Sequence, residues 1–341
     1  MRRESKITSP KALETEIQFE NKVRPQNFEE FVGQEKIKYK LKVYIDAAKG
    51  RNEPLDHIIF YGPPGLGKTT LAYIVAREIG VPIKTTSGPM LERPADLIGI
   101  LTSIKRGEVL FIDEIHRLSR TVEEFLYSAM EDFFIDIVLD KGPHARTVRL
   151  NLEHFTLIGS TTRAGLISAP LRSRFGIIER LNYYTEDDLT KIVMRTARII
   201  GAEIEMDAAR EIAHRARGTP RIANRILRRI RDFAQVDGFQ RITKESVEKG
   251  LSLLEIDREG LDEMDKRILL AIIEKFGGGP VGLKTLSMAV DEDMGTIEEI
   301  NEPFLIQKGF IQITQRGRMA TRKAYDYFSI PYPELNLWRN R

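Results

Sequence analysis

A glycine-rich segment followed by lysine and threonine carries the clearest chemical signal in the sequence. Residues 62–69 read Gly-Pro-Pro-Gly-Leu-Gly-Lys-Thr and match the pattern G-x-x-x-x-G-K-[ST] in full. The apolar run His57–Tyr61 precedes the segment, and the helical pattern Thr70–Glu78 follows it. In that context the glycines let backbone N–H groups close around phosphates, and the helix N-terminus adds its dipole. Lys68 is then expected to reach the β- and γ-phosphates, and Thr69 to ligate Mg²⁺.

Two adjacent carboxylates form a second candidate. Asp113 and Glu114 end the apolar run Val109–Ile112, which is typical of a buried parallel strand. Asp113 is expected to hold Mg²⁺ through water, and Glu114 to polarise an attacking water as general base. An apolar run before Asp-Glu is common and is weak evidence by itself. Because a complete phosphate-binding loop lies earlier in the chain, the pair is interpreted as part of a nucleotide site. His116 has no partner pattern, so we interpret it as structural.

Arginines supply the remaining candidates. Arg174 lies in the segment Leu171-Arg172-Ser173-Arg174-Phe175, after a predicted strand and a short helix. On residue types alone this is solvated surface charge, and the functional alternative is an arginine finger on a γ-phosphate. Arg221 begins a helix and forms an i, i+4, i+7 stripe with Arg225 and Arg228. That spacing alone predicts a solvated basic face, whereas the position of Arg221 at the start of the helix suggests a phosphate contact.

The elements that must position these residues alternate between strand-like and helical patterns from about residue 55 to residue 184. This alternation predicts a parallel sheet with crossover helices. A hairpin over Phe134–Asp140 and Thr147–Leu152, with its turn at residues 141–144, interrupts it. The predicted strands of the sheet are His57–Tyr61, Val81–Thr86, Val109–Asp113, Phe155–Thr161 and Arg180–Tyr184.

The chain changes character after Tyr184. Thr185, Gly218, Thr219-Pro220 and Thr243 mark helix boundaries of a small all-helical domain. Helical patterns at 262–276, 283–290 and 296–308 then precede two short strands, 310–314 and 319–321, around a basic turn at 315–318, which is the pattern of a winged helix. The predicted domains are an arm at 1–24, a large α/β domain at 25–184, a helical domain at 185–256 and a winged helix at 257–341.

Composition excludes several classes of protein. The absence of cysteine rules out disulfides, thiolate zinc sites, iron–sulfur clusters and a cysteine nucleophile. No apolar run approaches about 18 residues, so neither a membrane span nor membrane attachment is expected. Net charge is only +3, but residues 303–341 hold 7 Lys/Arg against 2 Asp/Glu, whereas residues 261–302 hold 4 against 10. The end of the chain is therefore a local basic patch.

The combined motifs resemble AAA+ ATPases, and the fuller strings are similar to the RuvB family, the bacterial Holliday-junction branch-migration motors. The resemblance covers roughly residues 20–330. The strings that carry it are Arg24-Pro25 with residues 31–35, then residues 62–70, 110–118, 161–165, 171–176, 217–224 and 317–321.

This resemblance implies a fold, cofactors and residue roles. The fold is an AAA+ P-loop ATPase domain with a parallel sheet, followed by an all-helical lid domain and a C-terminal winged-helix domain. ATP and Mg²⁺ are the implied cofactors, with Thr69 and Asp113 at the metal. The implied catalytic residues are Glu114, Thr162 as sensor 1, and Arg174 as a finger acting in the neighbouring subunit's site. The implied nucleotide-binding residues are Val23, Arg24, Gly62, Gly65, Gly67, Lys68, Thr69, Thr70, Asp113, Tyr184 and, as sensor 2, Arg221.

The implied function is ATP-dependent DNA translocation in the cytoplasm by a homohexamer on the double-stranded DNA of Holliday junctions. Binding should be independent of base sequence, because phosphate contacts serve a motor that moves over any sequence. Arg316 and Arg318 are the implied DNA contacts. Ile313 stands where many relatives carry another wing arginine, which questions one phosphate contact expected from the family.

The implied partners are RuvA, docked on the hairpin at 134–152, and the RuvC resolvase. The alternative for the hairpin is that it only packs on its own domain. Two alternatives for function also stay open. A clamp-loader-like ATP switch would carry a helical collar in place of the winged helix. A non-enzymatic DNA-binding regulator could lose Glu114 and Arg174, and this chain has both.

Overall fold

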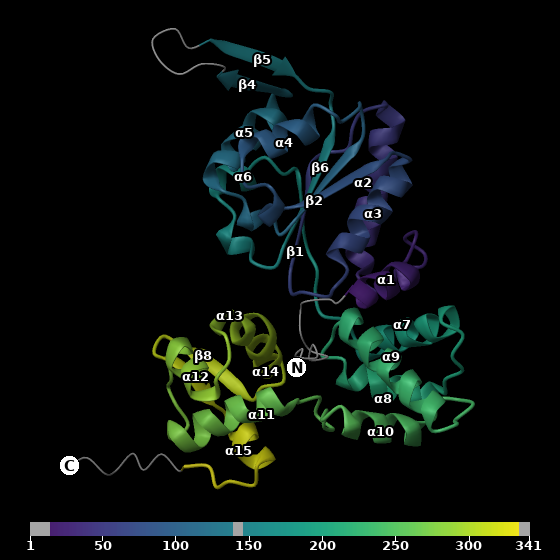
Figure 1. Ribbon diagram of the computed structural model, residues 1–341, viewed down its shortest axis with the longest axis vertical. Coiled ribbons are helices and arrows are strands. Elements are labelled where there is room, and N and C mark those ends of the chain that lie inside the picture. Colours follow the sequence, from purple (N-terminus) through teal and green to yellow (C-terminus); the bar gives the residue numbers. More distant parts are fainter. Residues whose placement is uncertain (1–13, 139–145, 334–341) are drawn as a thin grey trace, which may run out of the picture. The chain divides into compact units, whose positions relative to one another are not determined.

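The computed structural model describes residues 14–138 and 146–333, which form two compact units (Figure 1). The first unit is Phe19–Asp188, and the second consists mainly of the residues from Leu189 onward. Each is described by itself below. Among the described helices, none combines the length and the apolar character needed to cross a membrane.

A five-stranded parallel sheet with the order β2-β3-β6-β1-β7 forms the centre of the first unit. The parallel sheet with crossover helices is thus confirmed. In this order the strand before the glycine-rich loop, β1, and the strand before the carboxylates, β3, both lie next to β6. The strands are β1 (Ile58–Tyr61), β2 (Ile83–Ser87), β3 (Val109–Asp113), β6 (Thr156–Thr161) and β7 (Ile177–Arg180).

The last strand is the one that the sequence placed wrongly, at 180–184. It is β7, Ile177–Arg180, an edge strand whose residues alternate between buried and exposed. Its inward position at Glu179 is a carboxylate rather than an apolar residue, and Glu179 is paired with Lys40 at 2.9 Å. Because of this buried charge, the sequence of β7 lacks the apolar run that is typical of a strand in a parallel sheet.

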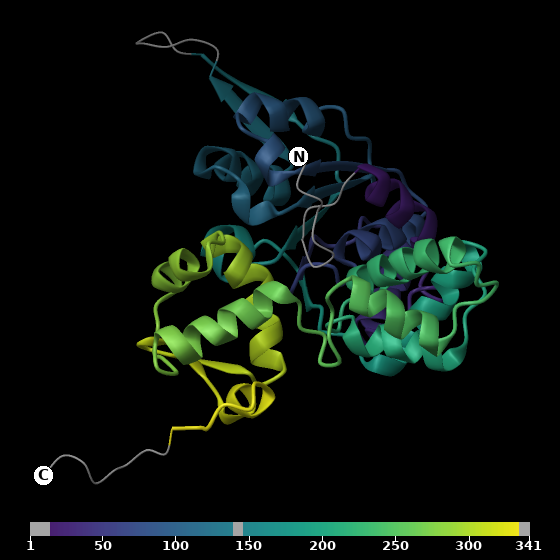
Figure 2. The same ribbon diagram turned by 60° about the horizontal axis from the view of Figure 1, so that its bottom comes forward.

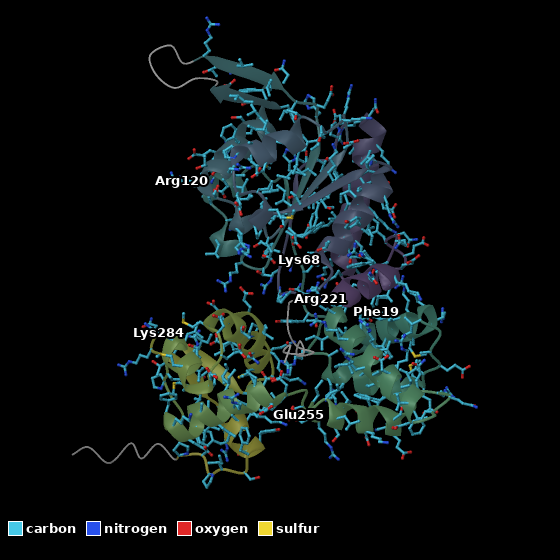
Figure 3. The ribbon with its side chains drawn as sticks, viewed as in Figure 1. Phe19, Lys68, Arg120, Arg221, Glu255 and Lys284 are labelled. Carbon is cyan, nitrogen blue, oxygen red and sulfur yellow. The ribbon has the colours of Figure 1, made fainter. Side chains whose placement is uncertain are left out.

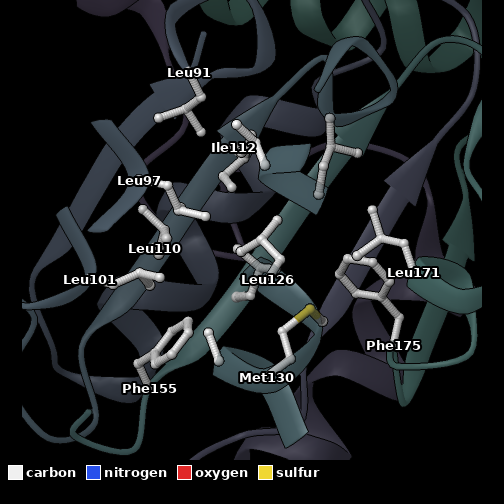
Figure 4. Packing of buried hydrophobic residues seen from close by; sticks show 14 of the residues in the cluster. Leu91, Leu97, Leu101, Leu110, Ile112, Leu126, Met130, Phe155, Leu171 and Phe175 are labelled. Carbon is white, nitrogen blue, oxygen red and sulfur yellow. The ribbon is translucent and has the colours of Figure 1, made fainter. Parts of the chain in front are cut away.

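Helices cover both faces of the sheet (Figure 1). Leu110 and Ile112 point from β3 into a core that also holds Leu97, Leu126 and Met130 (Figure 4). Each such side chain contributes about 1.5–3 kcal/mol by leaving water. One face carries α2 (Glu35–Arg51) and α3 (Lys68–Ile79); the other carries α4 (Pro94–Leu101), α5 (Arg120–Glu131) and α6 (Ala169–Arg172). Single 3₁₀ turns lie at Gly88–Met90, Ile115–Arg117 and Ala164–Leu166.

The predicted hairpin is present as β4 (Phe134–Val138) and β5 (Thr147–Asn151). Its predicted turn at 141–144 lies outside the described residues. Ile135 pairs with Leu150 and is buried in the core beside α5, whereas Val148, opposite Ile137, is 39% exposed. The base of the hairpin therefore packs on its own domain, and its outer part presents apolar surface.

The polar start of the chain, in which the sequence shows no period, contains a helix, α1 (Glu14–Val23). Phe19 and Val23 are four residues apart and so share one helix face; Val23 is buried and Phe19 half-buried. The helix has only three apolar residues, Ile17, Phe19 and Val23, which are too few to show a helical period in the sequence. Residues 1–13 of the predicted arm lie outside the described part.

The helical domain has the expected boundaries with one difference. The Thr185 hydroxyl accepts the Asp188 N–H at 3.2 Å, and Thr243 forms a capping box with Ser246. The second helix ends at Arg215 rather than at Gly218, because Arg217 already has a left-handed backbone. The helices are α7 (Glu186–Ile199), α8 (Met206–Arg215), α9 (Pro220–Val236) and α10 (Lys244–Leu253).

The last segment has the helices and the β-ribbon of a winged helix (Figure 2), as expected. Val281 pairs with Arg318 and so adds a bridge to the ribbon. Its α-helices are α11 (Glu263–Leu270), α12 (Leu283–Val290), α13 (Met294–Thr296), α14 (Glu302–Gln307) and α15 (Arg322–Tyr327). Short π-helical segments occupy Ala271–Lys275 and Ile297–Asn301. The β-ribbon consists of β8 (Ile311–Thr314) and β9 (Gly317–Ala320).

A buried ion pair joins two segments of the second unit. Arg217, just before α9, donates to the Asp265 carboxylate of α11 at 2.6 Å, and the Asn301 amide donates to the same carboxylate at 2.7 Å. Asp265 is fully buried. Burial raises the pKa of Asp265 to about 7, although Arg217 and the Asn301 amide oppose that rise.

Candidate functional site

The glycine-rich loop between β1 and α3 closes around its own lysine. Gly67 is left-handed (φ 96°) and caps α3, and a Cβ at Gly62 would lie 2.5 Å from the Leu181 carbonyl oxygen, so both positions require glycine. Lys68 is 7% exposed, and its Nζ donates to the carbonyl oxygens of Gly62 at 2.7 Å and Pro63 at 2.8 Å. The first turn of α3, labelled at Lys68 in Figure 3, therefore offers backbone N–H groups and a cation to an anion.

Asp113 lies at the carboxyl end of β3, next to the end of β6. Ile112 pairs with Gly159, so the next residues along, Asp113 and Ser160, are neighbours, and the Ser160 hydroxyl donates to the Asp113 carboxylate. The Glu114 N–H donates to Oδ1 of Asp113 at 3.0 Å, the oxygen that also accepts from Ser160. The motif search found Asp113 and missed Ser160, which only the strand register reveals.

Glu114 has a left-handed backbone (φ 49°), a conformation that costs a non-glycine residue free energy. Its Oε2 lies 3.2 Å from the Nδ1 of His116 and accepts a long hydrogen bond from the Thr162 hydroxyl at 3.4 Å. The Nδ1 of His116 is also 2.9 Å from the Thr161 hydroxyl. His116, interpreted from sequence as structural, is therefore a direct neighbour of the candidate base, as Thr162 is.

Repulsion between lone pairs favours the tautomer of His116 that carries its hydrogen on Nδ1. Thr161 Oγ1 already accepts the Arg163 N–H at 3.0 Å. A lone pair on Nδ1 would face the lone pairs of the Glu114 carboxylate, whereas an N–H donates to it. The imidazole thus fixes the orientation of the carboxylate.

Tyr184 lies against the glycine-rich loop, and its hydroxyl donates to the Leu66 carbonyl oxygen at 3.1 Å. Burial raises the pKa of this phenol well above its ordinary value, so Tyr184 acts as a neutral donor. Val23 is 4% exposed, and the Arg24 guanidinium lies over the Tyr73 ring of α3 at 4.8 Å. Arg24 and Tyr184 are thus both in contact with the segment 66–73. Thr69 and Thr70 in this segment, and Gly65 directly before it, are half-buried.

Arg174 is held by its own subunit. Its Nη1 donates to the Pro170 carbonyl oxygen at 2.7 Å and its Nη2 to Glu131 at 2.8 Å, while the guanidinium lies 4.5 Å from the centre of the Tyr127 ring. The side chain is only 18% exposed. The interpretation as solvated surface charge is therefore wrong.

The basic stripe on α9 is also not a solvated face. Arg225 is 7% exposed, and Arg221 and Arg228 are half-buried. Arg221 lies in the first turn of α9, after Thr219 at the N-cap and Pro220 at N1 (Figure 3). The helix boundary was predicted correctly, but the spacing of arginines alone could not reveal which face packs inward.

The two wing arginines have different surroundings. Arg316 is exposed between β8 and β9, and the exposed Ile313 lies opposite Arg318 in the ribbon. Arg318, expected in the turn, is instead on β9 and makes a two-bond fork with the Glu302 carboxylate, with Nη2–Oε2 at 2.9 Å. Glu302 is 3% exposed, and its hydrogen bond raises the pKa of the Arg318 guanidinium. Arg318 therefore has a buried partner within its own domain.

Three family models match consecutive parts of the chain. Residues 23–181 match the Holliday junction DNA helicase RuvB P-loop domain, residues 184–257 the RuvB AAA lid domain, and residues 258–329 the RuvB C-terminal winged helix domain. The matches cover the glycine-rich loop, the carboxylate pair and the wing.

Solved structures give the same result. The chain is 49% identical to the Thermotoga maritima RuvB Holliday junction branch migration motor, with 92% of this chain and 100% of that chain covered and a TM-score of 0.83. Two point mutants of Thermotoga maritima RuvB are each 50% identical, cover 91% of this chain and 99% of their own length, and have TM-scores of 0.84 and 0.85.

Proposed function

Since the chain belongs to the RuvB family of AAA+ Holliday-junction branch-migration motors, we propose that it hydrolyses ATP with Mg²⁺ to drive double-stranded DNA through branch migration. The observation that carries this proposal is the environment of Glu114. It follows β3, it is contacted by His116 and Thr162, and a complete phosphate-binding loop follows β1, on the other side of β6.

The phosphate site supports nucleotide binding. Lys68 would exchange the loop carbonyl oxygens for oxygens of the β- and γ-phosphates, and the first N–H groups of α3 would donate to the same phosphates. Val23, Arg24 and Tyr184 would surround the base and ribose. Arg221 would act as sensor 2 in its own subunit's site.

The oxygen donors fit a magnesium ion. Thr69 offers a hydroxyl and Asp113 a carboxylate, and Mg²⁺ is commonly bound by one or two such protein oxygens together with phosphate and water. Within the described residues, no cluster of three or more His, Cys, Asp or Glu side chains forms a metal cage. Bound there, Mg²⁺ would neutralise charge on the phosphates.

Hydrolysis needs a base and a positive charge on the far side of the γ-phosphate. Glu114 would take the proton of the attacking water, with His116 and Thr162 fixing its carboxylate. Arg174 would act in the site of a neighbouring subunit, which makes activity dependent on a ring, a homohexamer around DNA. Arg316, exposed on the wing, would contact the DNA phosphates, so binding would not depend on base sequence.

The partner proposals rest on the hairpin and on the family. The exposed Val148 at the outer part of β4–β5 would dock on RuvA, and RuvC would join as the resolvase. The motor would work in the cytoplasm, where its DNA substrate lies.

One experiment separates this proposal from both alternatives. ATP hydrolysis is measured with and without duplex DNA and RuvA, for the wild type and for Glu114→Gln. We expect stimulation by DNA and RuvA in the wild type, and nucleotide binding without turnover in the variant. A regulator would show no turnover in either protein. A clamp-loader-like switch would not respond to RuvA, and it also lacks the winged helix found at 258–329.

A further inference from the structure

One face of α5 holds the Arg174 guanidinium. Glu123, Tyr127 and Glu131 follow one another at four-residue steps and therefore lie on the same side of the helix. The guanidinium lies over the Tyr127 ring at 4.5 Å, and Glu131 accepts from Nη2 at 2.8 Å. A flat ring and a carboxylate thus fix the plane and the rotation of the guanidinium.

The Tyr127 ring is itself fixed to the segment that leads into Arg174. Its hydroxyl donates to Glu123 at 3.3 Å and lies 3.1 Å from the Ser168 hydroxyl. Ser168 donates to Glu123 at 3.1 Å and accepts the Leu171 N–H at 3.3 Å as the cap of α6. The support of the guanidinium and the start of α6 are therefore one hydrogen-bonded network.

The end of α5 is anchored as well. The carbonyl oxygen of Met130, the residue before Glu131, lies 3.1 Å from the Nε2 of His57, and the Nδ1 of His57 accepts the Leu157 N–H at 2.9 Å. Because Leu157 is on β6, one imidazole connects the last turn of α5 to the central sheet. Glu131 therefore projects from a rigid element.

The conformation of Arg174 leaves one of its hydrogen-bond donors unsatisfied. Its Nε is buried, and in the described part of the chain this atom has no hydrogen-bond partner. Leaving a buried donor without an acceptor costs free energy. The conformation persists because the ring, the carboxylate and the Pro170 carbonyl oxygen together outweigh that cost.

We propose that Tyr127 and Glu131 are positioning residues that orient Arg174 for a nucleotide bound by the neighbouring subunit. The inference rests on the proposed role of Arg174 as a finger in trans. Arginine has a long side chain with many rotamers, and holding it in advance lowers the entropy lost when it meets the γ-phosphate. Tyr127 and Glu131 touch no reacting atom and act only through Arg174.

The first test compares ATP turnover by rings of single variants. Tyr127→Leu removes the ring face and should lower kcat by roughly two- to thirty-fold, the range that corresponds to a cation–π contact. Glu131→Ala should also lower kcat, whereas Glu131→Gln keeps an acceptor and should restore most of the rate. Nucleotide affinity should be unchanged in all three. Glu124→Ala, on the same helix but 59% exposed, is the matched control and should equal the wild type.

The second test uses mixed rings, which a merely structural role would not affect in the same way. Tyr127→Leu subunits mixed with Lys68→Ala subunits should recover activity, because the latter supply an intact finger to an intact site. Tyr127→Leu mixed with Arg174→Ala should not rise above the rate of Tyr127→Leu rings, since neither variant supplies a correctly oriented finger. The double variant Tyr127→Leu/Arg174→Ala should be no slower than Arg174→Ala.

The outcomes separate this inference from the proposed function. If Arg174→Ala keeps its activity in rings, or is not complemented by Lys68→Ala, the finger assignment itself is wrong. If Arg174 behaves as a finger but Tyr127→Leu recovers with Arg174→Ala, or Glu131→Ala equals the wild type, the positioning role is wrong. Should Tyr127→Leu not fold, the Glu131→Ala and Glu131→Gln pair in the same mixed rings decides the question alone.

Discussion

The imidazole Nδ1 of His116 lies 3.2 Å from the carboxylate Oε2 of Glu114, the proposed general base. The two residues belong to one turn after β3, yet Glu114 needs a left-handed backbone to bring its carboxylate to the ring. In the tautomer with its hydrogen on Nδ1, the imidazole can donate to the carboxylate and orient it.

This contact predicts how His116 variants behave. His116→Ala should lower kcat with little change in KM, because the carboxylate loses one of its orienting donors. The loss should be smaller than the roughly 10²–10⁴-fold that a general base supplies. His116→Asn should recover part of the rate, because its amide nitrogen takes the place of Nδ1. The measurement is steady-state kinetics with saturating DNA. If both variants had the wild-type kcat, His116 would have no role in the site.

Isolated Arg174→Ala subunits should bind ATP with the affinity of wild-type subunits. Rings of this variant should lose ATP turnover. Arginine fingers supply roughly 10³–10⁵ in rate, so the loss should be of that order. Equilibrium binding of a nucleotide and multiple-turnover hydrolysis are measured on the same preparation. Lys68→Ala is the contrasting variant, since it should lose nucleotide affinity. A large loss of affinity in Arg174→Ala would instead place this arginine in its own subunit's site.

The two wing arginines should differ in the kind of defect. Arg316→Ala should weaken DNA binding about equally for all sequences and reduce the salt slope of log K by roughly one. Arg318→Ala leaves the buried Glu302 carboxylate unpaired, so it should lower the free energy of unfolding by roughly 3–5 kcal/mol. DNA titrations at several salt concentrations and thermal unfolding measure the two effects. A stable Arg318→Ala protein with weakened DNA binding would make Arg318 a direct DNA contact.

Val148→Glu should abolish RuvA binding and leave basal ATP hydrolysis intact. The substitution puts a charge on the exposed apolar part of the hairpin, whereas the buried base at Ile135 is untouched. Val43→Glu on α2 is the matched control, because that valine is 46% exposed on another surface. Affinity for RuvA is measured by titration. Loss of basal hydrolysis with unchanged RuvA affinity would show that the hairpin serves only its own domain.

Asp265 should give the second unit a pH-dependent stability. Its pKa is about 7 in the folded chain against an ordinary 3.8, so the native state keeps a proton that the unfolded chain has lost between about pH 4 and 7. The free energy of unfolding therefore falls as pH rises through that window and levels off above it. Asp265→Asn should remove this part of the slope, while Arg217 keeps the Asp262 carboxylate at 3.2 Å as an ion-pair partner.

Thermal unfolding of the wild type and Asp265→Asn at several pH values between 5 and 8 measures this slope. Asp291→Asn changes an exposed aspartate of the same unit and should keep the wild-type slope. Equal slopes for the wild type and Asp265→Asn would show that the carboxyl titrates alike in the folded and unfolded chains.

The sequence predicted those parts of the site whose chemistry is contained in a few consecutive residues. Lys68 and Thr69 follow their glycines directly, and Asp113 and Glu114 follow their strand, so pattern and context were sufficient. Ser160 was missed because it joins Asp113 only through the register of β3 and β6.

The contacts of Arg174 and Arg217 were beyond a sequence reading for a related reason. Glu131 and Asp265 are far from these arginines in the chain, and the packing of helices decides the pairing. The strand β7 was misplaced because the buried Glu179 breaks its apolar pattern, and the ion pair with Lys40 that permits this burial is a tertiary contact.

The path of the chain between β3 and β6 has a consequence for how such a motor can change. These strands are parallel neighbours in the sheet, so the chain between Asp113 and Thr156 leaves the carboxyl end of β3 and returns at the other edge of the sheet, where Thr156 pairs with Val109. Within this stretch, the Leu152 N–H donates to the Phe133 carbonyl oxygen at 2.7 Å, and this hydrogen bond closes the base of the hairpin. Substitutions or length changes in the hairpin beyond this hydrogen bond should leave the register of β3 and β6 unaltered. The spacing of Asp113 and Ser160 then stays the same. The outer hairpin can therefore coevolve with a partner protein while the hydrolytic chemistry stays under separate selection.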